Sequence, residues 1–184
     1  MLEEIIIAGF GGQGVLSMGQ TLAYAAMLEN MDISWMPSYG PEMRGGTANC
    51  ITILSDELIS SPIISVYDTG ILLNTPSMEK FESKIKPGGL IVYDSTTVQI
   101  TPTRTDIDII AIPAAEEAVR LKNNKVLNMI LLGAYLEKKP VIKMESIIDA
   151  LKKVLPERYH HLLAINKEAL ELGKELVSKQ LAVV

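Results

Sequence analysis

The feature that most constrains the fold is a glycine-rich turn between an apolar run and a helical pattern. Residues 5–8 are apolar and mostly β-branched, which is typical of a strand buried on both faces of a parallel sheet. A cluster of four glycines follows at positions 9–14, and from Val15 onward apolar residues recur at three- and four-residue steps, as in a helix. We therefore predict a central strand, a tight turn and a helix.

The glycine spacing indicates a turn that can approach a ligand closely. Gly9, Gly11 and Gly14 fit the pattern G-x-G-x-x-G, in which glycine permits φ > 0 and leaves no side chain between the backbone and a ligand. Amides at the start of the following helix would favour a phosphate or a carboxylate. A dinucleotide site also needs an acidic residue about 20 residues further on, at the end of the second strand. The predicted second strand, residues 33–37, ends without one, which counts against NAD and leaves anion binding, partner binding and a purely structural turn open.

The composition bounds the class of protein. With 184 residues, of which 48% are hydrophobic, the chain is long enough for one well-buried domain, and we predict a single domain over residues 1–184. The net charge of −5, with scattered basic residues, argues against a nucleic-acid partner. Cys50 is the single cysteine, so the chain alone cannot hold an iron–sulfur cluster that needs about four thiolates. The start of the chain and its short apolar runs predict a cytoplasmic protein without membrane contact.

A second special segment interrupts the periodic pattern at residues 36–47, which read Met-Pro-Ser-Tyr-Gly-Pro-Glu-Met-Arg-Gly-Gly-Thr. The two glycines after Arg44 allow a sharp turn that leaves the guanidinium free to bind a planar anion. Arg44 could instead pair with Glu42, and Tyr39 could simply pack. The segment alone does not decide between these interpretations.

The rest of the chain alternates between strand and helix patterns. Strands are predicted over residues 48–54, 71–74, 90–94 and 107–113. Helices are predicted over residues 76–84, 114–121, 126–135, 144–155 and 161–179, and a turn over residues 86–89. This alternation predicts an α/β fold, a three-layer α/β/α sandwich with a largely parallel sheet and a helical carboxyl-terminal end. The strand at residues 48–54 is the one that could run antiparallel.

The helix predicted over residues 126–135 is apolar nearly all round and contains Asn128 and Gly133. A buried amide must find hydrogen-bond partners, and glycine inside a helix costs about 1 kcal/mol unless close packing requires it. We therefore predict a tight contact of this helix with another helix or another subunit.

Some polar residues have both a functional and a structural interpretation. Asn74 and Asp94 end predicted strands and are candidates for a ligand-binding edge, although helix capping is the commoner role of such residues. His160 and His161 should begin the last helix as surface residues, because the spacing of ligands for a metal is missing around them. We predict no metal site.

The two special segments together, Gly-Phe-Gly-Gly-Gln-Gly-Val at residues 9–15 and Ser-Tyr-Gly-Pro-Glu-Met-Arg-Gly-Gly at residues 38–46, resemble the gamma subunit of the 2-oxoacid:ferredoxin oxidoreductases. The similarity continues through residues 55–56 and 59–62 and through the helix that contains Asn128. The beta subunit of indolepyruvate:ferredoxin oxidoreductase shares the glycine turn but usually carries His-Gly-Met before its arginine. The resemblance therefore favours the branch that acts on pyruvate, 2-oxoglutarate or ketoisovalerate, and leaves the individual 2-oxoacid open.

The resemblance implies a subunit, inactive alone, of a complex that oxidatively decarboxylates a 2-oxoacid, joins the acyl group to coenzyme A and passes electrons to ferredoxin. In that family thiamine diphosphate, magnesium and the iron–sulfur clusters belong to alpha, beta and delta-type partner chains. A free-standing Rossmann-like nucleotide-binding oxidoreductase and a non-catalytic assembly scaffold are the alternatives. No catalytic residue is assigned. The candidates for cofactor binding or subunit contact are Gly9, Gly11, Gly12, Gln13, Gly14, Ser38, Tyr39, Gly40, Pro41, Glu42, Arg44, Gly45, Gly46 and Asn128.

Overall fold

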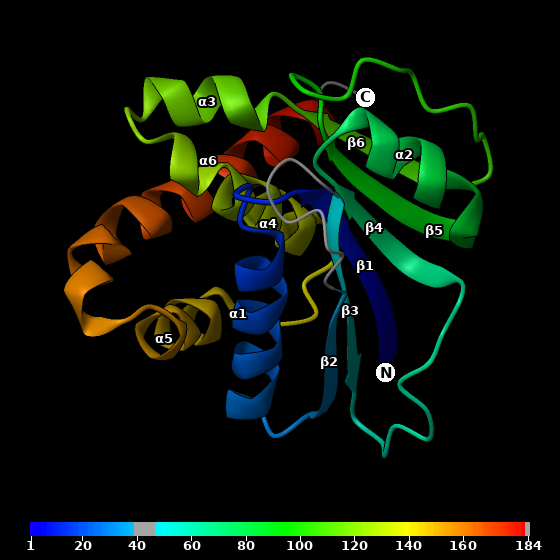
Figure 1. The fold of residues 1–184 in the computed structure, drawn as a ribbon, viewed down its shortest axis with the longest axis horizontal. Helices are drawn as coiled ribbons and strands as arrows, with labels where there is room; N and C mark the ends of the chain where they lie inside the picture. The colour runs from blue at the N-terminus through cyan, green and yellow to red at the C-terminus, as the bar shows by residue number, and fades with distance from the viewer. Residues whose placement is uncertain (39–46, 183–184) are drawn as a thin grey trace.

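The computed structural model describes residues 1–38 and 47–182, and these residues form a six-stranded sheet with helices on both faces (Figure 1). The strands are β1 (Leu2–Phe10), β2 (Asp32–Ser38), β3 (Thr47–Ser55), β4 (Tyr67–Leu72), β5 (Ile85–Asp94) and β6 (Asp108–Ile112). The α-helices are α1 (Val15–Leu28), α2 (Thr75–Phe81), α3 (Ala114–Arg120), α4 (Leu127–Lys138), α5 (Met144–Val154) and α6 (Leu163–Leu181). The 3₁₀ helices are η1 (Glu82–Lys84), η2 (Asn124–Val126) and η3 (Glu157–Leu162).

The sheet is mixed, with the strand order β2-β3-β1-β4-β5-β6. β1, β4, β5 and β6 pair in parallel, whereas β3 pairs antiparallel with both β1 and β2. β2 therefore runs in the same direction as β1, and the carboxyl ends of five strands meet at one side of the sheet, which we call the carboxyl edge. The predicted largely parallel sheet with an antiparallel strand near residues 48–54 is confirmed.

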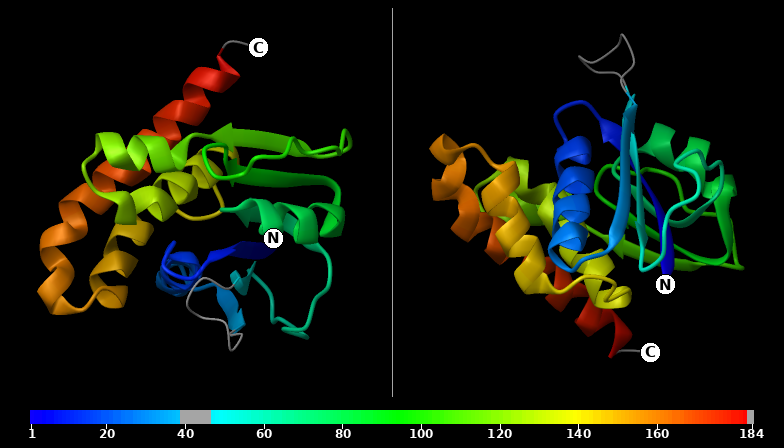
Figure 2. Two further views of the ribbon diagram at one scale, coloured as in Figure 1. Left: turned by 45° about the horizontal axis from the view of Figure 1, so that its top comes forward. Right: turned by 90° about the horizontal axis from the view of Figure 1, so that it is seen from below.

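Alternating side chains of β1 divide the core into two layers. Ile5 and Ile7 belong to the cluster under α1, α3, α4, α5 and α6, whereas Ile6 and Ala8 belong to the cluster on the other face, under α2. The two views of Figure 2 show the helices on the two sides of the sheet. The three-layer sandwich predicted from the sequence is confirmed, and the only α-helix on the second face within the described ranges is the seven-residue α2.

Helices α4 and α6 cross at unusually close range. Residues 127–136 of α4 are all buried. A Cβ atom added to Gly133 would lie 2.8 Å from the carbonyl carbon of Leu170, and one added to Gly173 would lie 2.8 Å from the carbonyl carbon of Ile130. The glycines thus let two helix backbones touch, and the tight contact predicted for Gly133 is with another helix.

The turn predicted at residues 86–89 is wrong, because this segment lies inside β5. The pairing of β4 with β5 jumps from Tyr67 opposite Ile85 to Thr69 opposite Leu90, so the extra residues bulge out of the ladder. Gly88 has φ 74°, and its N–H donates to the carbonyl of Asp106 at 2.7 Å. The proline and glycines mark an irregular stretch of strand rather than its beginning.

Two further boundaries differ from the sequence prediction. β4 spans Tyr67–Leu72 instead of residues 71–74, and Asn74 lies after it as the N-cap of α2. His160 and His161 belong to η3 rather than to α6, which begins at Leu163. Within the described ranges, every helix falls short of the length and apolarity that crossing a membrane requires.

Candidate functional site

The glycine turn lies at the carboxyl edge, between β1 and α1. Gly12 and Gly14 have φ angles of 94° and 77°, which glycine adopts without strain. Gly9 is needed for a different reason: an added Cβ atom would lie 2.7 Å from Oε1 of Gln13 and 2.9 Å from Cβ of Leu73. The sequence correctly indicated a glycine turn, but the left-handed conformation is confined to Gly12 and Gly14.

Gln13 fixes the turn to the neighbouring strand. Its Oε1 accepts the Phe10 N–H at 2.6 Å, and its Nε2 donates to the carbonyl of Leu73, just after β4, at 3.1 Å. The Gln13 N–H in turn donates to the Phe10 carbonyl at 3.2 Å. These bonds hold the turn rigidly and leave Gly11 and Gly12 exposed to solvent.

Asn128 supports the other end of the turn from α4. Its Nδ2 donates to the carbonyl of Gly14 at 3.2 Å, and the side chain is only 5% exposed. A Cβ atom on Gly14 would lie 2.8 Å from Cγ of Asn128, so the glycine makes room for the amide. The structure thus brings together two candidates that are 114 residues apart in the sequence.

Among the described residues, the start of α1 has no side-chain cap and no acidic residue in its first turn. Gly14 is the N-cap of this helix. The partial positive charge of a helix start is therefore not neutralised by the helix's own side chains. Among residues 1–38 and 47–182, nothing lies within 4 Å of a Cβ atom added to Gly12, so these residues leave the turn open to an approaching group.

Both ends of the second special segment reach the same edge. Phe10 pairs with Thr47, and Ser38 pairs with Asn49 two positions further along β3. Ser38, predicted in the loop, is the last residue of β2. The candidates that lie outside the described residues are Tyr39, Gly40, Pro41, Glu42, Arg44, Gly45 and Gly46.

Asn74 and Asp94 are capping residues at this edge. Oδ1 of Asn74 accepts the Ser77 N–H at 2.8 Å at the start of α2. The buried carboxylate of Asp94 accepts the Ala115 N–H at 3.2 Å at the start of α3. Thr97, which the sequence did not single out, lies with Oγ1 at 2.8 Å from Asp94 Oδ2 and 2.6 Å from the Leu73 carbonyl. The capping interpretation of Asn74 and Asp94 accounts for these contacts.

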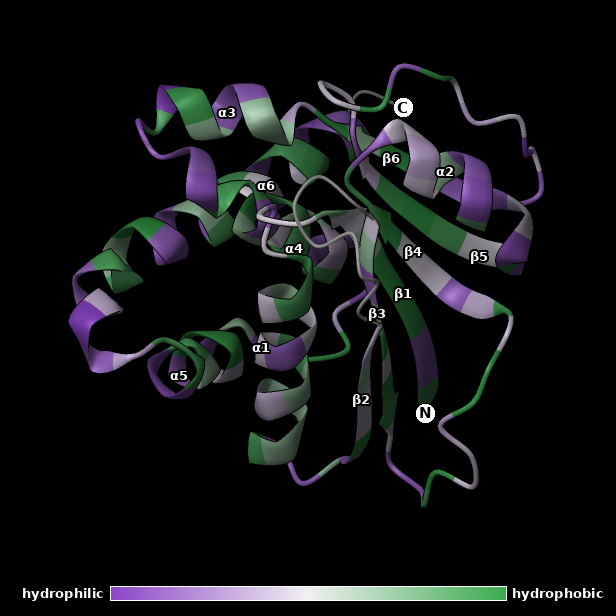
Figure 3. Cartoon of the chain, viewed as in Figure 1, coloured by the Kyte–Doolittle hydropathy of each residue, from purple (hydrophilic) through white to green (hydrophobic). Residues whose placement is uncertain are grey.

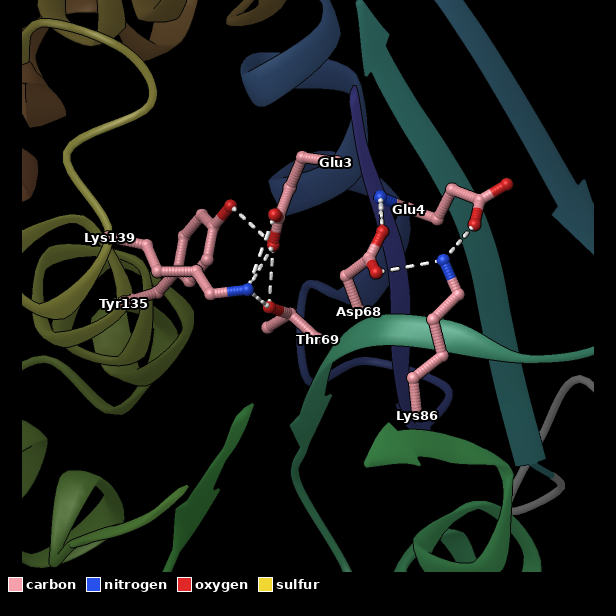
Figure 4. A network of polar contacts seen from close by, with 7 residues as sticks. All are labelled: Glu3, Glu4, Asp68, Thr69, Lys86, Tyr135 and Lys139. Carbon is pink, nitrogen blue, oxygen red and sulfur yellow. Dashed lines mark hydrogen bonds and ion pairs between the residues drawn. The ribbon is translucent and has the colours of Figure 1, made fainter. Parts of the chain in front are cut away.

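The opposite, amino-terminal edge of the sheet carries a buried polar network that the sequence analysis missed (Figure 4). The Glu3 carboxylate accepts the Thr69 hydroxyl at 2.6 Å and the Lys139 ammonium at 3.0 Å, and the Tyr135 hydroxyl lies 3.4 Å away. Burial, and then the Glu3 charge, raise the pKa of the Tyr135 phenol well above its ordinary value. An acidic residue before an apolar strand and a lysine after an apolar helix were the available signals.

A second group lies beside this network on the other face of β1. Lys86 Nζ binds the carboxylates of Glu4 at 2.5 Å and Asp68 at 2.8 Å. Among the described residues, no three or more His, Cys, Asp or Glu side chains are placed to hold a metal ion. The carboxylates of both groups are paired with lysines and serve as structural ion pairs.

Cys50 is buried beneath α1. Its Sγ lies 3.6 Å from the Val15 carbonyl, and desolvation raises the pKa of the thiol to about 12. The neutral thiol that follows is a poor nucleophile and a poor metal ligand.

Comparison with known proteins decides the family. The family model described as pyruvate ferredoxin/flavodoxin oxidoreductase matches residues 4–176. The chain belongs to this family. Ketoisovalerate oxidoreductase subunit VorA of Methanothermobacter marburgensis is 36% identical over 179 residues, which cover 97% of this chain and 37% of VorA. 2-Oxoglutarate synthase subunit KorC of Methanocaldococcus jannaschii is 34% identical over 185 residues, which cover 96% of both chains.

Solved structures of the family have the same fold. The gamma subunit of keto/oxoacid ferredoxin oxidoreductase from Geobacter sulfurreducens has a TM-score of 0.82 and 26% identity, covering 96% of this chain and 99% of that one. The 2-oxoglutarate:ferredoxin oxidoreductase of Magnetococcus marinus, with 2-oxoglutarate, coenzyme A and succinyl-CoA bound, has a TM-score of 0.87 and 27% identity, covering 97% of this chain but 31% of that one. The resemblance to the gamma subunit is confirmed. The chain spans only about a third of VorA and of the Magnetococcus chain.

Proposed function

We propose that the chain is a gamma-type subunit of a multi-chain 2-oxoacid:ferredoxin oxidoreductase and acts as one domain over residues 1–184, in the cytoplasm. Its glycine turn and the segment 39–46 contribute to a site that partner chains complete. Alpha, beta and delta-type partners carry thiamine diphosphate, magnesium and the iron–sulfur clusters, coenzyme A is the co-substrate, and ferredoxin accepts the electrons. The family match over residues 4–176 supports this assignment.

The observation that carries the proposal is the exposed pair Gly11 and Gly12 before the uncapped start of α1, at the edge that both ends of the second special segment reach. The open turn at Gly12 and the unneutralised helix start suit an anion, and Ser38 and Thr47 bring the ends of the connecting segment to the same edge. Arg44 belongs to that segment and would add a planar cation. The anion we assign to this place is a phosphate of coenzyme A or the carboxylate of the 2-oxoacid; a carboxylate of a partner chain is the structural alternative.

The strand order argues against the free-standing nucleotide-binding oxidoreductase. In a dinucleotide fold the strand that carries the ribose-binding carboxylate lies next to the first strand. Here β3 lies between β1 and β2, which moves the end of β2 to about 10 Å from β1, and β2 ends in Ser38. The described residues thus supply neither the position nor the carboxylate of that site.

The test is reconstitution from separately purified chains. We expect no oxidation of any 2-oxoacid by this chain alone, and coenzyme A-dependent reduction of ferredoxin when the partner chains are added. Arg44→Lys keeps the charge but loses the two-pronged contact, which is worth roughly 1.5–3 kcal/mol, so the KM for coenzyme A or the 2-oxoacid should rise about tenfold or more with assembly intact. Arg158→Lys, at an exposed arginine of η3, is the matched control.

Three outcomes would contradict parts of the proposal. Oxidation of a 2-oxoacid, or tight NADH binding, by the isolated chain would overturn the subunit assignment. Lost assembly with normal kinetics in the remaining complex would assign Arg44 to an interface. A variant indistinguishable from the unmodified chain would remove Arg44 from the site.

A further inference from the structure

The connection between β3 and β4 exposes three large apolar side chains to solvent. Within residues 58–66, Leu58 is 91% exposed, Ile63 is 79% exposed and Val66 is 49% exposed. Isolated apolar side chains on a surface are ordinary, whereas a group of them marks an interaction site. Figure 3 shows green, apolar stretches along this connection where it runs away from the sheet.

A hydrogen bond and packing against the core hold the backbone of this connection, so its exposed apolar side chains have defined positions. The Ile59 N–H donates to Oδ2 of Asp32 at 2.6 Å, and Ile59 and Ile64 pack against the core on the α2 side of the sheet. The anchored residues alternate with Leu58 and Ile63, which project outward. A fixed backbone lowers the entropic cost of binding a partner through these side chains.

A hollow lies beside the anchored part of the connection. It has a volume of about 280 Å³ and is lined by Met1, Leu2, Glu4, Ile53 and residues 55–61. This volume lies at the lower limit of small-molecule sites, which is about 300 Å³, and it is large enough for an inserted apolar side chain.

The charge around the hollow is negative. Four carboxylates face two cations in this part of the described surface. Glu4, Asp56 and Glu57 line the hollow, and Asp68 lies beside Glu4. Lys86 pairs with both Glu4 and Asp68, and the amino group of Met1 pairs with Asp56, so the group keeps a net negative charge that includes Glu57. A complementary surface therefore combines an apolar side chain with a lysine or an arginine.

We propose that this acidic-apolar surface, comprising Leu58, Ile63 and Val66 with the hollow and its carboxylates, is the docking surface for a partner chain of the oxidoreductase complex. The partner segment inserts an apolar side chain into the hollow and places a basic side chain beside Glu57, a lining carboxylate for which the described residues supply no ion pair. A second copy of this chain does not fit, because a two-fold contact through one patch would bring the acidic groups of both copies together. The inference rests on the proposed function, since the partner is a chain of that complex.

The surface is separate from the glycine turn. It lies at the amino-terminal end of β1, and the turn lies at the other end of this nine-residue strand, about 26 Å away at the usual rise of a strand. It contains residues 55–56 and 59–62, which share the resemblance to the gamma subunit but have no part in the carboxyl edge. A docking role would explain why residues 55–56 and 59–62 share the resemblance, which the proposed anion site at the carboxyl edge does not explain.

The experiment measures binding of the full chain to the preassembled partner chains by size-exclusion chromatography and by interferometry on immobilised partners. The double variant L58E/I63E should weaken binding at least tenfold, and Glu57→Lys should weaken it and reduce its salt dependence. Both alter exposed positions, so unchanged circular dichroism and melting temperature are expected. Val119→Glu, at a 60% exposed apolar residue of α3, is the matched control and should bind normally.

Each alternative outcome overturns a defined statement. Wild-type affinity in L58E/I63E would overturn the docking surface while the proposed function stands, because the unmodified chain still assembles. Failure of the unmodified chain to assemble would overturn both. A homodimer of the unmodified chain that L58E/I63E converts to a monomer would replace the partner chain by a second copy.

Discussion

Replacing Gly133 by alanine tests the close crossing of α4 and α6. In an exposed helix this change would stabilise the fold by about 1 kcal/mol, because alanine has the higher helix propensity. At the crossing, the new Cβ atom would lie 2.8 Å from the carbonyl carbon and 2.9 Å from the Cα atom of Leu170. Carbon atoms prefer about 3.5–4.0 Å, so the two backbones must separate by about 1 Å.

The loss of stability expected for Gly133→Ala depends on how far the backbones of α4 and α6 can move apart. Overpacking a core costs typically 1–3 kcal/mol, and the upper end applies because a backbone cannot rotate away as a side chain can. After subtraction of the propensity gain, we expect the free energy of unfolding to fall by about 2 kcal/mol. For a chain of this length that corresponds to a melting temperature lower by about 4–8 °C.

The assay is urea and thermal unfolding followed by circular dichroism. Glu168→Ala, at an exposed position of α6, is the control and should change stability by less than about 0.5 kcal/mol. Gly173→Ala should match Gly133→Ala, and the double variant should lose less than the sum, because one separation of the helices relieves both contacts. A higher stability for Gly133→Ala would refute the close crossing.

Two further predictions concern the turn and the buried thiol. Asn128→Ala removes the donor to the Gly14 carbonyl and should lower the free energy of unfolding by about 1–2 kcal/mol. Amide hydrogen exchange over residues 11–18 should become faster, and unchanged exchange there would show that Asn128 does not support the turn. Burial raises the pKa of Cys50 from its ordinary value of 9.0 to about 12, so the folded state keeps a proton that the unfolded state loses. The free energy of unfolding should therefore fall as the pH rises from about 9 toward 12, by at most about 1.4 kcal/mol per pH unit from this group. In unfolding experiments across that pH range, the Cys50→Ala variant should lose stability less steeply than the unmodified chain.

The elements that the sequence predicted correctly have local causes. The strand at residues 5–8, the glycine turn and the buried helix around Asn128 follow from hydrophobic period and from glycine spacing, which neighbouring residues determine. β3 lies between β1 and β2 because of pairing between strands that are distant in the sequence. The hydrophobic pattern along the chain does not encode this strand order.

The candidate site divides in the same way. Gly9, Gly12 and Gly14 were identifiable because each needs a missing side chain for a local reason, either a close contact or a positive φ. The roles of Gln13 and Asn128 depend on the carbonyls of Leu73 and Gly14, which are 60 and 114 residues away from them in the sequence. The pairing of Glu3 with Lys139, across 136 residues, is equally invisible to local patterns.

The placement of β3 has a consequence for how this family can diversify. Residues 39–46 leave the sheet from β2 and re-enter it on β3, its antiparallel neighbour, so both attachment points belong to one pair of strands. Such a segment can change in length and chemistry without altering any other strand pairing, as surface connections commonly do. Exchange of residues 39–46 between relatives is therefore a route by which evolution, or a protein engineer, can alter the anion site proposed at the carboxyl edge while the strand pairing of the sheet is kept.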